Sequence, residues 1–222
     1  MTAPTVKGFN VAARIHGRVL VREAADAVAI VAGFHGYMEN AEIQMARLEA
    51  LPTSDRATLV SVQGLNRFYR GRSQDVVAGW MTRQDREAMI ADNIAYCDRA
   101  IELAARPELP FFTLGFSQGV AMAFRAATRG RRRAVGVVAV GGDVPPELLQ
   151  DATITFPAVL LARGEEDEWY TSAKLEADAS ALRARHTAVE TLVYPGRHEW
   201  TAEVAAAASR FLSRCLTDRI AG

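Results

Sequence analysis

Short runs of apolar residues, bounded by glycine, proline and polar residues, recur along the chain. Continuous apolar runs of about four to eight residues are typical of strands buried on both faces of a sheet. On this basis we expect buried strands at residues 28–33, 58–62, 111–115, 135–140, 158–162 and 190–194. Two shorter runs, 12–15 and 18–22, predict an antiparallel hairpin around His16-Gly17 near the N-terminus.

Apolar residues three and four positions apart predict helices between these strands, each with one face for the sheet. The two clearest stripes are Ile90, Ile94, Cys97, Ile101 and Val204, Ala208, Phe211, Cys215. Strands that alternate with helices indicate an α/β fold, a mostly parallel sheet with helices on both faces. The 222 residues are enough for a sizeable core, so we expect a single domain over residues 1–222.

The sequence Gly115-Phe116-Ser117-Gln118-Gly119 directly follows one predicted strand and precedes a helical stretch at 120–129. A serine between a strand and a helix in this pattern lies on a sharp turn that exposes its hydroxyl, as a nucleophile requires. The two glycines leave room for close packing around that turn. The placement favours a catalytic serine over a chance occurrence of the motif, and the other members of a triad should decide between the two.

A serine nucleophile needs a base, and in this architecture the histidine follows both the serine and the acid along the chain. His16 and His35 precede Ser117, and His186 lies before the last predicted strand. His198 follows that strand through a Pro-Gly turn. We therefore predict His198 as the base.

The acid that orients the histidine is expected on a loop after a strand. The predicted strand at 158–162 leads into a glycine and then four consecutive acids, residues 165–168. Such a run is ordinarily a solvated surface, but a short aspartate just after a turn suits a carboxylate that must reach the imidazole Nδ1. Asp167 is the first choice, and Asp143, which also follows a strand, is the alternative.

The tetrahedral intermediate of acyl transfer needs N–H donors for its oxyanion. The predicted strand at 28–33 opens into Phe34-His35-Gly36-Tyr37, a position from which this architecture takes one donor. We predict the backbone N–H groups of Tyr37 and Gln118 as the oxyanion hole. His35 is expected to brace the loop by hydrogen bonding and not to take part in the reaction.

Four motifs in this order resemble the α/β-hydrolase superfamily and, within it, the small phospholipase/carboxylesterase family of serine esterases. They lie at residues 34–37, 115–119, 164–167 and 196–199. The resemblance implies an α/β-hydrolase fold and a triad of Ser117, Asp167 and His198. It also implies hydrolysis of an ester or thioester through an acyl-enzyme intermediate, without a cofactor.

Two features depart from the family pattern and bear on the substrate class. Val120 stands where such enzymes often carry another small residue. Residues 64–81 mix arginines with aromatic and apolar side chains, so we expect either a lid or pocket-lining loop or a surface loop held down by its aromatic residues. We predict Trp80, Met38 and Trp169 as substrate-binding side chains.

The composition favours an enzyme without nucleic-acid or membrane partners. The 26 basic residues balance the 26 acidic ones, so no overall field attracts polyanions. No stretch approaches the roughly 18 apolar residues of a spanning helix, and the N-terminus lacks an apolar leader, so we predict a cytoplasmic protein with reduced cysteines. No convergent set of metal ligands is evident, and we expect no metal.

These features predict a serine carboxylesterase that acts on a small-molecule ester. They leave both a monomer and a homodimer open. An acyltransferase or a peptidase with the same triad is one alternative. A degenerate hydrolase fold that serves as a binding module is the other. The combination of nucleophile, acid, base and oxyanion loop argues against the binding module, which has no need of all four.

Overall fold

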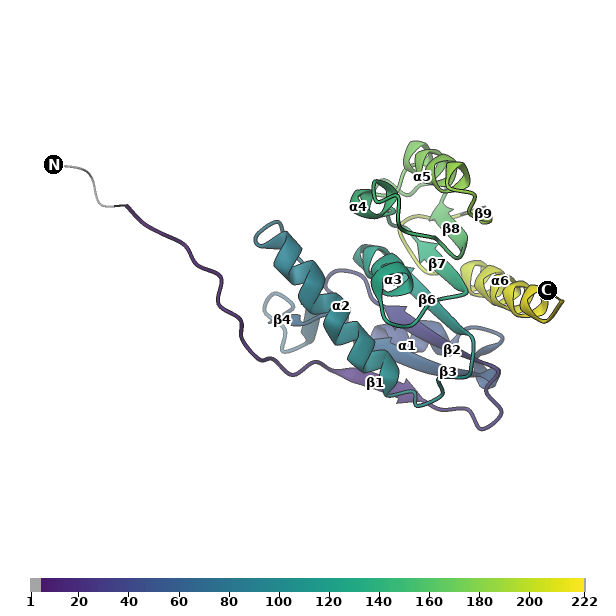
Figure 1. Ribbon diagram of the computed structural model, residues 1–222, viewed down its shortest axis with the longest axis horizontal. Helices are drawn as coiled ribbons and strands as arrows, with labels where there is room; N and C mark the ends of the chain where they lie inside the picture. The colour runs from purple at the N-terminus through teal and green to yellow at the C-terminus, as the bar shows by residue number, and fades with distance from the viewer. Residues whose placement is uncertain (1–4, 222) are drawn as a thin grey trace.

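A seven-stranded sheet forms the centre of the computed structural model, which describes residues 5–221 (Figure 1). The strands follow the spatial order β1-β3-β2-β6-β7-β8-β9, and only β1 runs antiparallel to its neighbour. Their bounds are β1 Val19–Arg22, β2 Ala29–Phe34, β3 Ala57–Val62, β6 Phe111–Phe116, β7 Gly136–Val140, β8 Ala158–Gly164 and β9 Val189–Tyr194. The six strands after β1 correspond to the six predicted apolar runs, and the predicted α/β-hydrolase architecture is confirmed.

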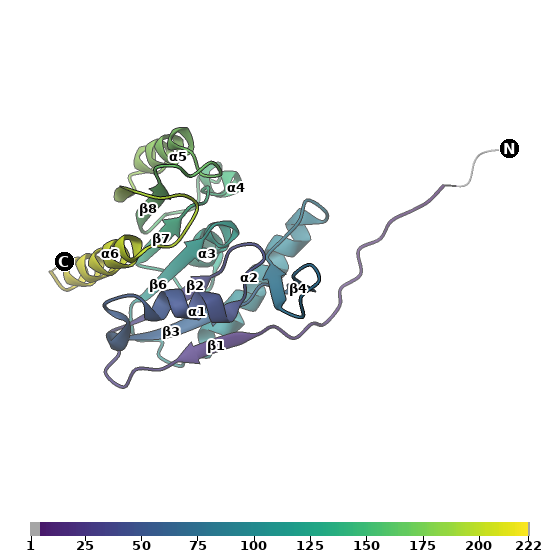
Figure 2. The ribbon, with the colours of Figure 1, turned by 180° about the vertical axis from the view of Figure 1, so that it is seen from behind.

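The N-terminal antiparallel pairing is present, but with a different partner from the one predicted. Residues 12–15 form no strand, and β1 pairs with β3 instead, Val19 opposite Val62. Pairing with the buried strand β3 places β1 at the edge of the large sheet. The chain before His16 runs away from the body of the molecule (Figures 1 and 2), and His16 O accepts from Arg67 at 2.8 Å.

Helices cover both faces of the sheet, as the alternating pattern predicts. Their bounds are α1 Ala41–Glu49, α2 Arg86–Glu102, α3 Gln118–Arg129, α4 Pro146–Leu149, α5 Ser172–Ala184 and α6 Ala202–Ala221, with a short 3₁₀ turn at Ser54–Arg56. Side chains alternate along β2, so that Ile30 and Ala32 face α2 and α3 while Val31 faces the side of α1 and α6. The result is two hydrophobic cores, one on each face of the sheet.

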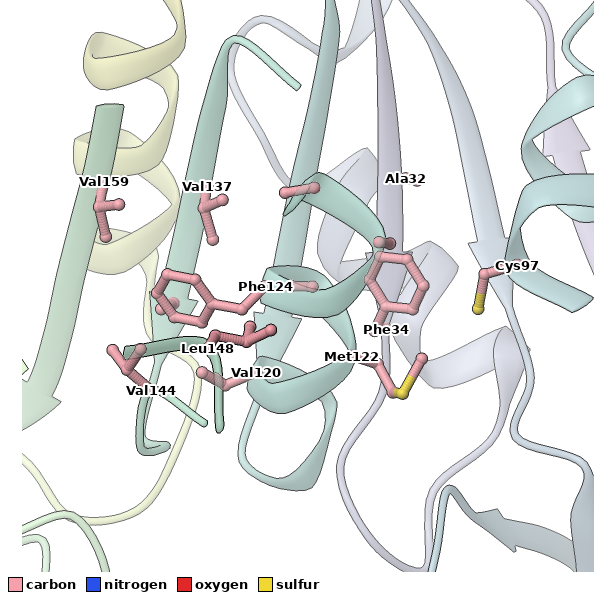
Figure 3. Packing of buried hydrophobic residues seen from close by; sticks show 14 of the residues in the cluster. Ala32, Phe34, Cys97, Val120, Met122, Phe124, Val137, Val144, Leu148 and Val159 are labelled. Carbon is pink, nitrogen blue, oxygen red and sulfur yellow. The ribbon is translucent and has the colours of Figure 1, made fainter. Parts of the chain in front are cut away.

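The helix α3 lies at the centre of one core. Met122 and Phe124 are fully buried there, beside Phe34 of β2 and Val137 of β7 (Figure 3). Because α3 begins immediately after β6, this packing fixes the direction in which the chain leaves the sheet. The packing of α3 against the sheet therefore holds the strand-to-helix turn at Ser117 in place.

Residues 64–81 form a β-hairpin and not the irregular loop expected from the sequence. Its strands are β4 Asn66–Tyr69 and β5 Val76–Gly79, which pair with each other outside the main sheet. Hydrogen bonds from Met38 N–H to Ala78 O (3.1 Å) and from Ala78 N–H to Glu39 O (2.8 Å) join β5 to the loop after β2. These pairings supply the regular structure, because they satisfy backbone groups that an isolated loop would leave to water. A lid function for this segment stays a prediction.

Candidate active site

Ser117 occupies a strained turn between β6 and α3. Its backbone has φ 52° and ψ −123°, a conformation that residues other than glycine rarely adopt. A Cβ on Gly115 would lie 2.6 Å from Gly119 O, and one on Gly119 would lie 2.1 Å from Phe34 O. Only glycine fits at these two positions, which is the physical reason for the motif.

Ser117 and His198 lie within hydrogen-bonding distance of each other, and so do His198 and Asp167. The Ser117 Oγ is 2.8 Å from His198 Nε2, and His198 Nδ1 is 2.9 Å from Asp167 Oδ2. Asp143, the alternative acid, is exposed and instead lies 3.3 Å from the Lys174 ammonium. The structure therefore brings together the first-choice residues, from loops that follow β6, β8 and β9.

Asp167 is held by backbone donors on the far side of its carboxylate. The N–H groups of Trp169 and Tyr170 donate to Oδ1 at 2.8 and 2.9 Å, which leaves Oδ2 for His198. The Asp167 side chain has no exposed surface. A buried carboxylate with these donors is fixed in position, with Oδ2 directed at the imidazole.

The imidazole of His198 is held by packing on two sides. Its ring centre lies 5.1 Å from that of Phe116. On another side lies Gly141, in the left-handed region at φ 66°, where an added Cβ would come within 3.0 Å of the imidazole Cε1. The ring is therefore confined to the plane from which it reaches both Ser117 and Asp167.

The loop after β2 packs against the turn of Ser117, since a Cβ on Gly119 would lie 2.6 Å from His35 O. Met38 has a positive φ of 61°, and its N–H donates to Ala78 O. The Gly36 N–H donates to Glu39 Oε2 at 2.7 Å. Among the described residues, the N–H groups of Tyr37 and Gln118 make no hydrogen bond. The geometry thus leaves the two predicted oxyanion donors free for a ligand.

His35 serves as a brace for this loop. It is fully buried, the Gly64 N–H donates to its Nε2 at 2.9 Å, and its Nδ1 lies 2.6 Å from Gly36 O. Because Nε2 accepts, the proton is on Nδ1. Burial lowers the pKa of the His35 imidazole, which keeps it neutral and suited to this pair of contacts.

An ion pair that the sequence analysis missed supports the same loop. Arg47 of α1 donates to both carboxylate oxygens of Glu39, each at 2.6 Å, and the Arg47 guanidinium lies 4.1 Å from the centre of the Phe116 ring. Burial would raise the pKa of the Glu39 carboxyl, but the Arg47 guanidinium outweighs this effect and holds the pKa below its usual value. Glu39 is four residues after His35, and no sequence pattern distinguishes it from other surface acids.

Trp80 is a support for the loop and not a pocket wall, which corrects the prediction. Its side chain is fully buried, packs against Phe34 and His35, and donates from Nε1 to His35 O at 2.8 Å. A side chain without exposed surface makes no contact with a substrate in this conformation. Its backbone N–H donates to the Gln118 side chain at 2.8 Å, which ties the hairpin to α3.

A cavity of about 340 Å³ opens beside Ser117. Trp169, which is 74 % exposed, lines its wall, and its contact with a substrate stays a prediction. Met38 is 37 % exposed but is not among the lining residues. The remaining lining residues are Arg86, Gln118, Ala121, Arg125, Gly141, Gly142, Asp143, Val144, Pro145, Pro146 and Lys174.

Residues 76–216 match the family model described as phospholipase/carboxylesterase. This match covers more than half of the chain. The chain belongs to the phospholipase/carboxylesterase family. Like the other members of this family it is a hydrolase that acts on ester bonds, which confirms the resemblance stated from its motifs. A search of curated protein sequences found no match.

Solved structures of esterases have the same fold as this family member. The esterase PE8 aligns with a TM-score of 0.71 and 18 % identity over 90 % of this chain and 100 % of its own. The acyl-protein thioesterase 2 of Zea mays aligns with a TM-score of 0.70 and 19 % identity over the same shares. The carboxylesterase of Bacillus cereus aligns with a TM-score of 0.69 and 15 % identity, over 90 % of this chain and 94 % of its own.

Residues 5–221 contain neither a membrane-spanning helix nor a cluster of metal-ligating side chains. None of the helices there has the length and apolar character needed to cross a bilayer. Within the same residues, no three histidine, cysteine or acidic side chains lie close enough together to ligate a metal ion.

Proposed function

We propose that the protein is a serine carboxylesterase that works through a Ser117-His198-Asp167 triad and an acyl-enzyme intermediate. The observation that carries this proposal is the position of His198. Its two ring nitrogens lie 2.8 Å from Ser117 Oγ and 2.9 Å from Asp167 Oδ2. A histidine between a strained serine and a buried carboxylate is suited to proton transfer in acyl chemistry.

In the first half-reaction, Ser117 Oγ attacks the ester carbon and its proton passes to His198 Nε2. The carbonyl oxygen becomes an oxyanion, and the free N–H groups of Tyr37 and Gln118 donate to it. The bond from the carbon to the alcohol oxygen then breaks, and His198 returns the proton to the departing alcohol. Ser117 is left as an acyl ester.

In the second half-reaction, water replaces the alcohol. His198 takes a proton from the water as it attacks the acyl-enzyme, and returns that proton to Ser117 Oγ when the acid leaves. Asp167 fixes the Nδ1–H tautomer and stabilises the imidazolium. A thioester passes through the same steps with a thiol as the leaving group, and thioester hydrolysis by the Zea mays neighbour agrees with this wider range.

Hydrolysis of 4-nitrophenyl butyrate by the wild type and by Ser117→Ala tests the proposal. We expect kcat to fall at least about 10⁴-fold in Ser117→Ala, because loss of the nucleophile leaves only binding and oxyanion stabilisation. Ser172→Ala is the matched control, since Ser172 also lies at the start of a helix but is exposed and away from His198. Near-normal turnover by folded Ser117→Ala protein would contradict the proposal.

A further inference from the structure

The cavity beside Ser117 contains more charge than an acyl pocket for a long alkyl chain. Four of its lining side chains are ionisable: Arg86, Arg125, Lys174 and Asp143. Pockets for apolar ligands are lined mainly by hydrophobic side chains, and an alkyl chain here would remove these charged groups from water. The lining, together with the volume of about 340 Å³, indicates a short polar acyl group.

Ser117, Ala121 and Arg125 line the cavity at intervals of four residues along one face of α3. Eight residues of helix span about 12 Å, and side chains tilt back toward the helix N-terminus. Arg125 is thereby directed toward Ser117, and the small Ala121 leaves the space between them open. Allowing for the length of the arginine side chain, the gap suits an acyl group with about three or four carbon atoms between its two ends.

Arg125 is short of acceptors. Only 1 % of its side chain is exposed, and its Nε and one terminal nitrogen both donate to Glu147 Oε1, at 2.9 and 2.6 Å. Its other terminal nitrogen has only thioether sulfurs nearby, Met81 Sδ at 3.6 Å and Met122 Sδ at 4.0 Å. Thioethers are weak acceptors, so a buried cationic nitrogen is left without a strong partner.

The charge balance around Arg125 is also incomplete. Glu147 is shared, because its Oε2 accepts from Arg86 at 3.3 Å. Lys174 lies 3.3 Å from Asp143, so that pair is balanced. Two guanidinium groups therefore face one carboxylate at the end of the cavity that is remote from Ser117. A second carboxylate would complete the set, through a charge-assisted hydrogen bond from the Arg125 nitrogen that lacks an oxygen acceptor.

A second hollow, beside His198, indicates which part of the substrate occupies the cavity between Ser117 and Arg125. His198, which must protonate the leaving oxygen, lines a separate hollow of about 430 Å³ with Phe116 and Trp200, and it does not line the cavity of Arg125. The leaving alcohol or thiol accordingly lies toward Phe116 and Trp200. The acyl group is left for the cavity between Ser117 and Arg125.

We propose that the preferred substrates are half-esters or half-thioesters of short dicarboxylic acids, whose free carboxylate binds Arg125 and Arg86. This inference rests on the proposed function, since it takes Ser117 as the point of attack. The carboxylate accepts from the Arg125 nitrogen that now has only sulfur neighbours, and Arg86 neutralises it from the more exposed side.

Two matched esters test the inference: 4-nitrophenyl hydrogen glutarate and 4-nitrophenyl 5-methylhexanoate, in which an isopropyl group replaces the carboxylate. We expect kcat/KM of the wild type to favour the glutarate ester by about 10- to 100-fold, the worth of a charge-assisted hydrogen bond. A ratio of one or less would overturn the inference, whatever the absolute rate on the neutral ester.

Single substitutions then test which arginines produce the preference for the glutarate ester. The ratio should fall about tenfold or more in Arg86→Met and in Arg125→Met, with thermal melts to confirm folding of the latter. Arg106→Met is the matched control, because Arg106 has similar exposure (41 % against 44 %) and one ion pair but lies away from Ser117. An unchanged ratio in Arg86→Met and in folded Arg125→Met would contradict the assignment.

A binding measurement separates this inference from the proposed function. Glutaramate and 5-methylhexanamide, the unreactive amides of the same acyl groups, are titrated into Ser117→Ala by calorimetry. Tighter binding of glutaramate, lost in Ser117→Ala/Arg86→Met, supports the carboxylate site even if another residue is the nucleophile. Equal binding of both amides would reject the site while leaving serine catalysis intact.

Discussion

The two halves of the candidate site are held in place by different means. Ser117, His198 and Asp167 lie on short turns after β6, β9 and β8, and mostly backbone constraints fix them: positive φ at Ser117, and N–H groups that hold Asp167. The loop at residues 35–40, which carries the proposed oxyanion donor Tyr37, is instead fixed by groups from elements far from it in the sequence. Its partners are Arg47, the hairpin residues Gly64 and Ala78, and Trp80.

This difference separates what a local sequence can encode from what only the fold provides. A turn held by glycines and backbone donors leaves a recognisable motif, because few residues can occupy its positions. A loop held by residues distant in the sequence leaves none, since each partner is an ordinary residue in its own segment. Substitutions in the turns of Ser117, His198 and Asp167 should therefore abolish ester hydrolysis. Substitutions that loosen the loop at residues 35–40 should lower its rate.

The largest effect is expected from Asp167→Asn. An amide keeps the shape but allows the His198 imidazole to adopt the wrong tautomer, which costs roughly 10⁴ in kcat in serine proteases. Asp143→Asn is the matched control, because Asp143 lies at the same cavity but pairs only with Lys174. Steady-state ester hydrolysis by both variants checks the assignment. A large loss confined to Asp143→Asn would reverse it.

Gly119→Ala should disrupt the turn itself. The added Cβ would lie 2.1 Å from Phe34 O, so β2 and α3 must separate, at a cost of about 1–3 kcal/mol or more in the free energy of unfolding. Ester turnover should fall with it, since Ser117 moves relative to His198. Gly8→Ala is the control, because its added Cβ has no neighbour within 4 Å. Equal melting temperatures for the two variants would argue against a tightly packed turn.

Glu39→Gln should lower kcat by about 10- to 100-fold with little change in KM. The amide loses the bidentate pair with Arg47 and so loosens the loop that presents the Tyr37 N–H, and misplacement of one oxyanion donor has an effect of this order. Glu42→Gln is the control, since Glu42 also pairs with an arginine, Arg18, but is about half exposed. A similar kcat in both variants would show that the loop does not depend on the pair.

The smallest effect expected is a pH dependence of stability that depends on Glu39. The pKa of this carboxyl is below its ordinary value of 4.5 in the folded protein. Its stabilising contribution is therefore fully present above the unfolded value and is lost as the pH falls through the folded one. The melting temperature of the wild type should exceed that of Glu39→Gln at about pH 6, and the difference should shrink toward about pH 3. A constant difference would contradict this.

The sequence was sufficient for the parts of the fold that depend on local pattern. The apolar runs predicted six sheet strands, because strands buried on both faces tolerate few polar residues. The β4–β5 hairpin was missed, since β4 is exposed and the pairing depends on contacts with residues 38–40. Trp80 was placed in the pocket because nothing in its own segment distinguishes an aromatic side chain in the core from one at a surface. The Arg125–Glu147 pair joins residues 22 positions apart through tertiary packing, so no motif marks it.

Labelling with a fluorophosphonate probe tests the central claim most directly, because such probes react with an activated serine. The protein is treated with the probe, digested and analysed by peptide mass spectrometry. We expect one adduct, on the peptide that contains Ser117, and no adduct on folded His198→Asn protein. An adduct on a different residue, or ester hydrolysis by protein that the probe leaves unlabelled, would contradict it.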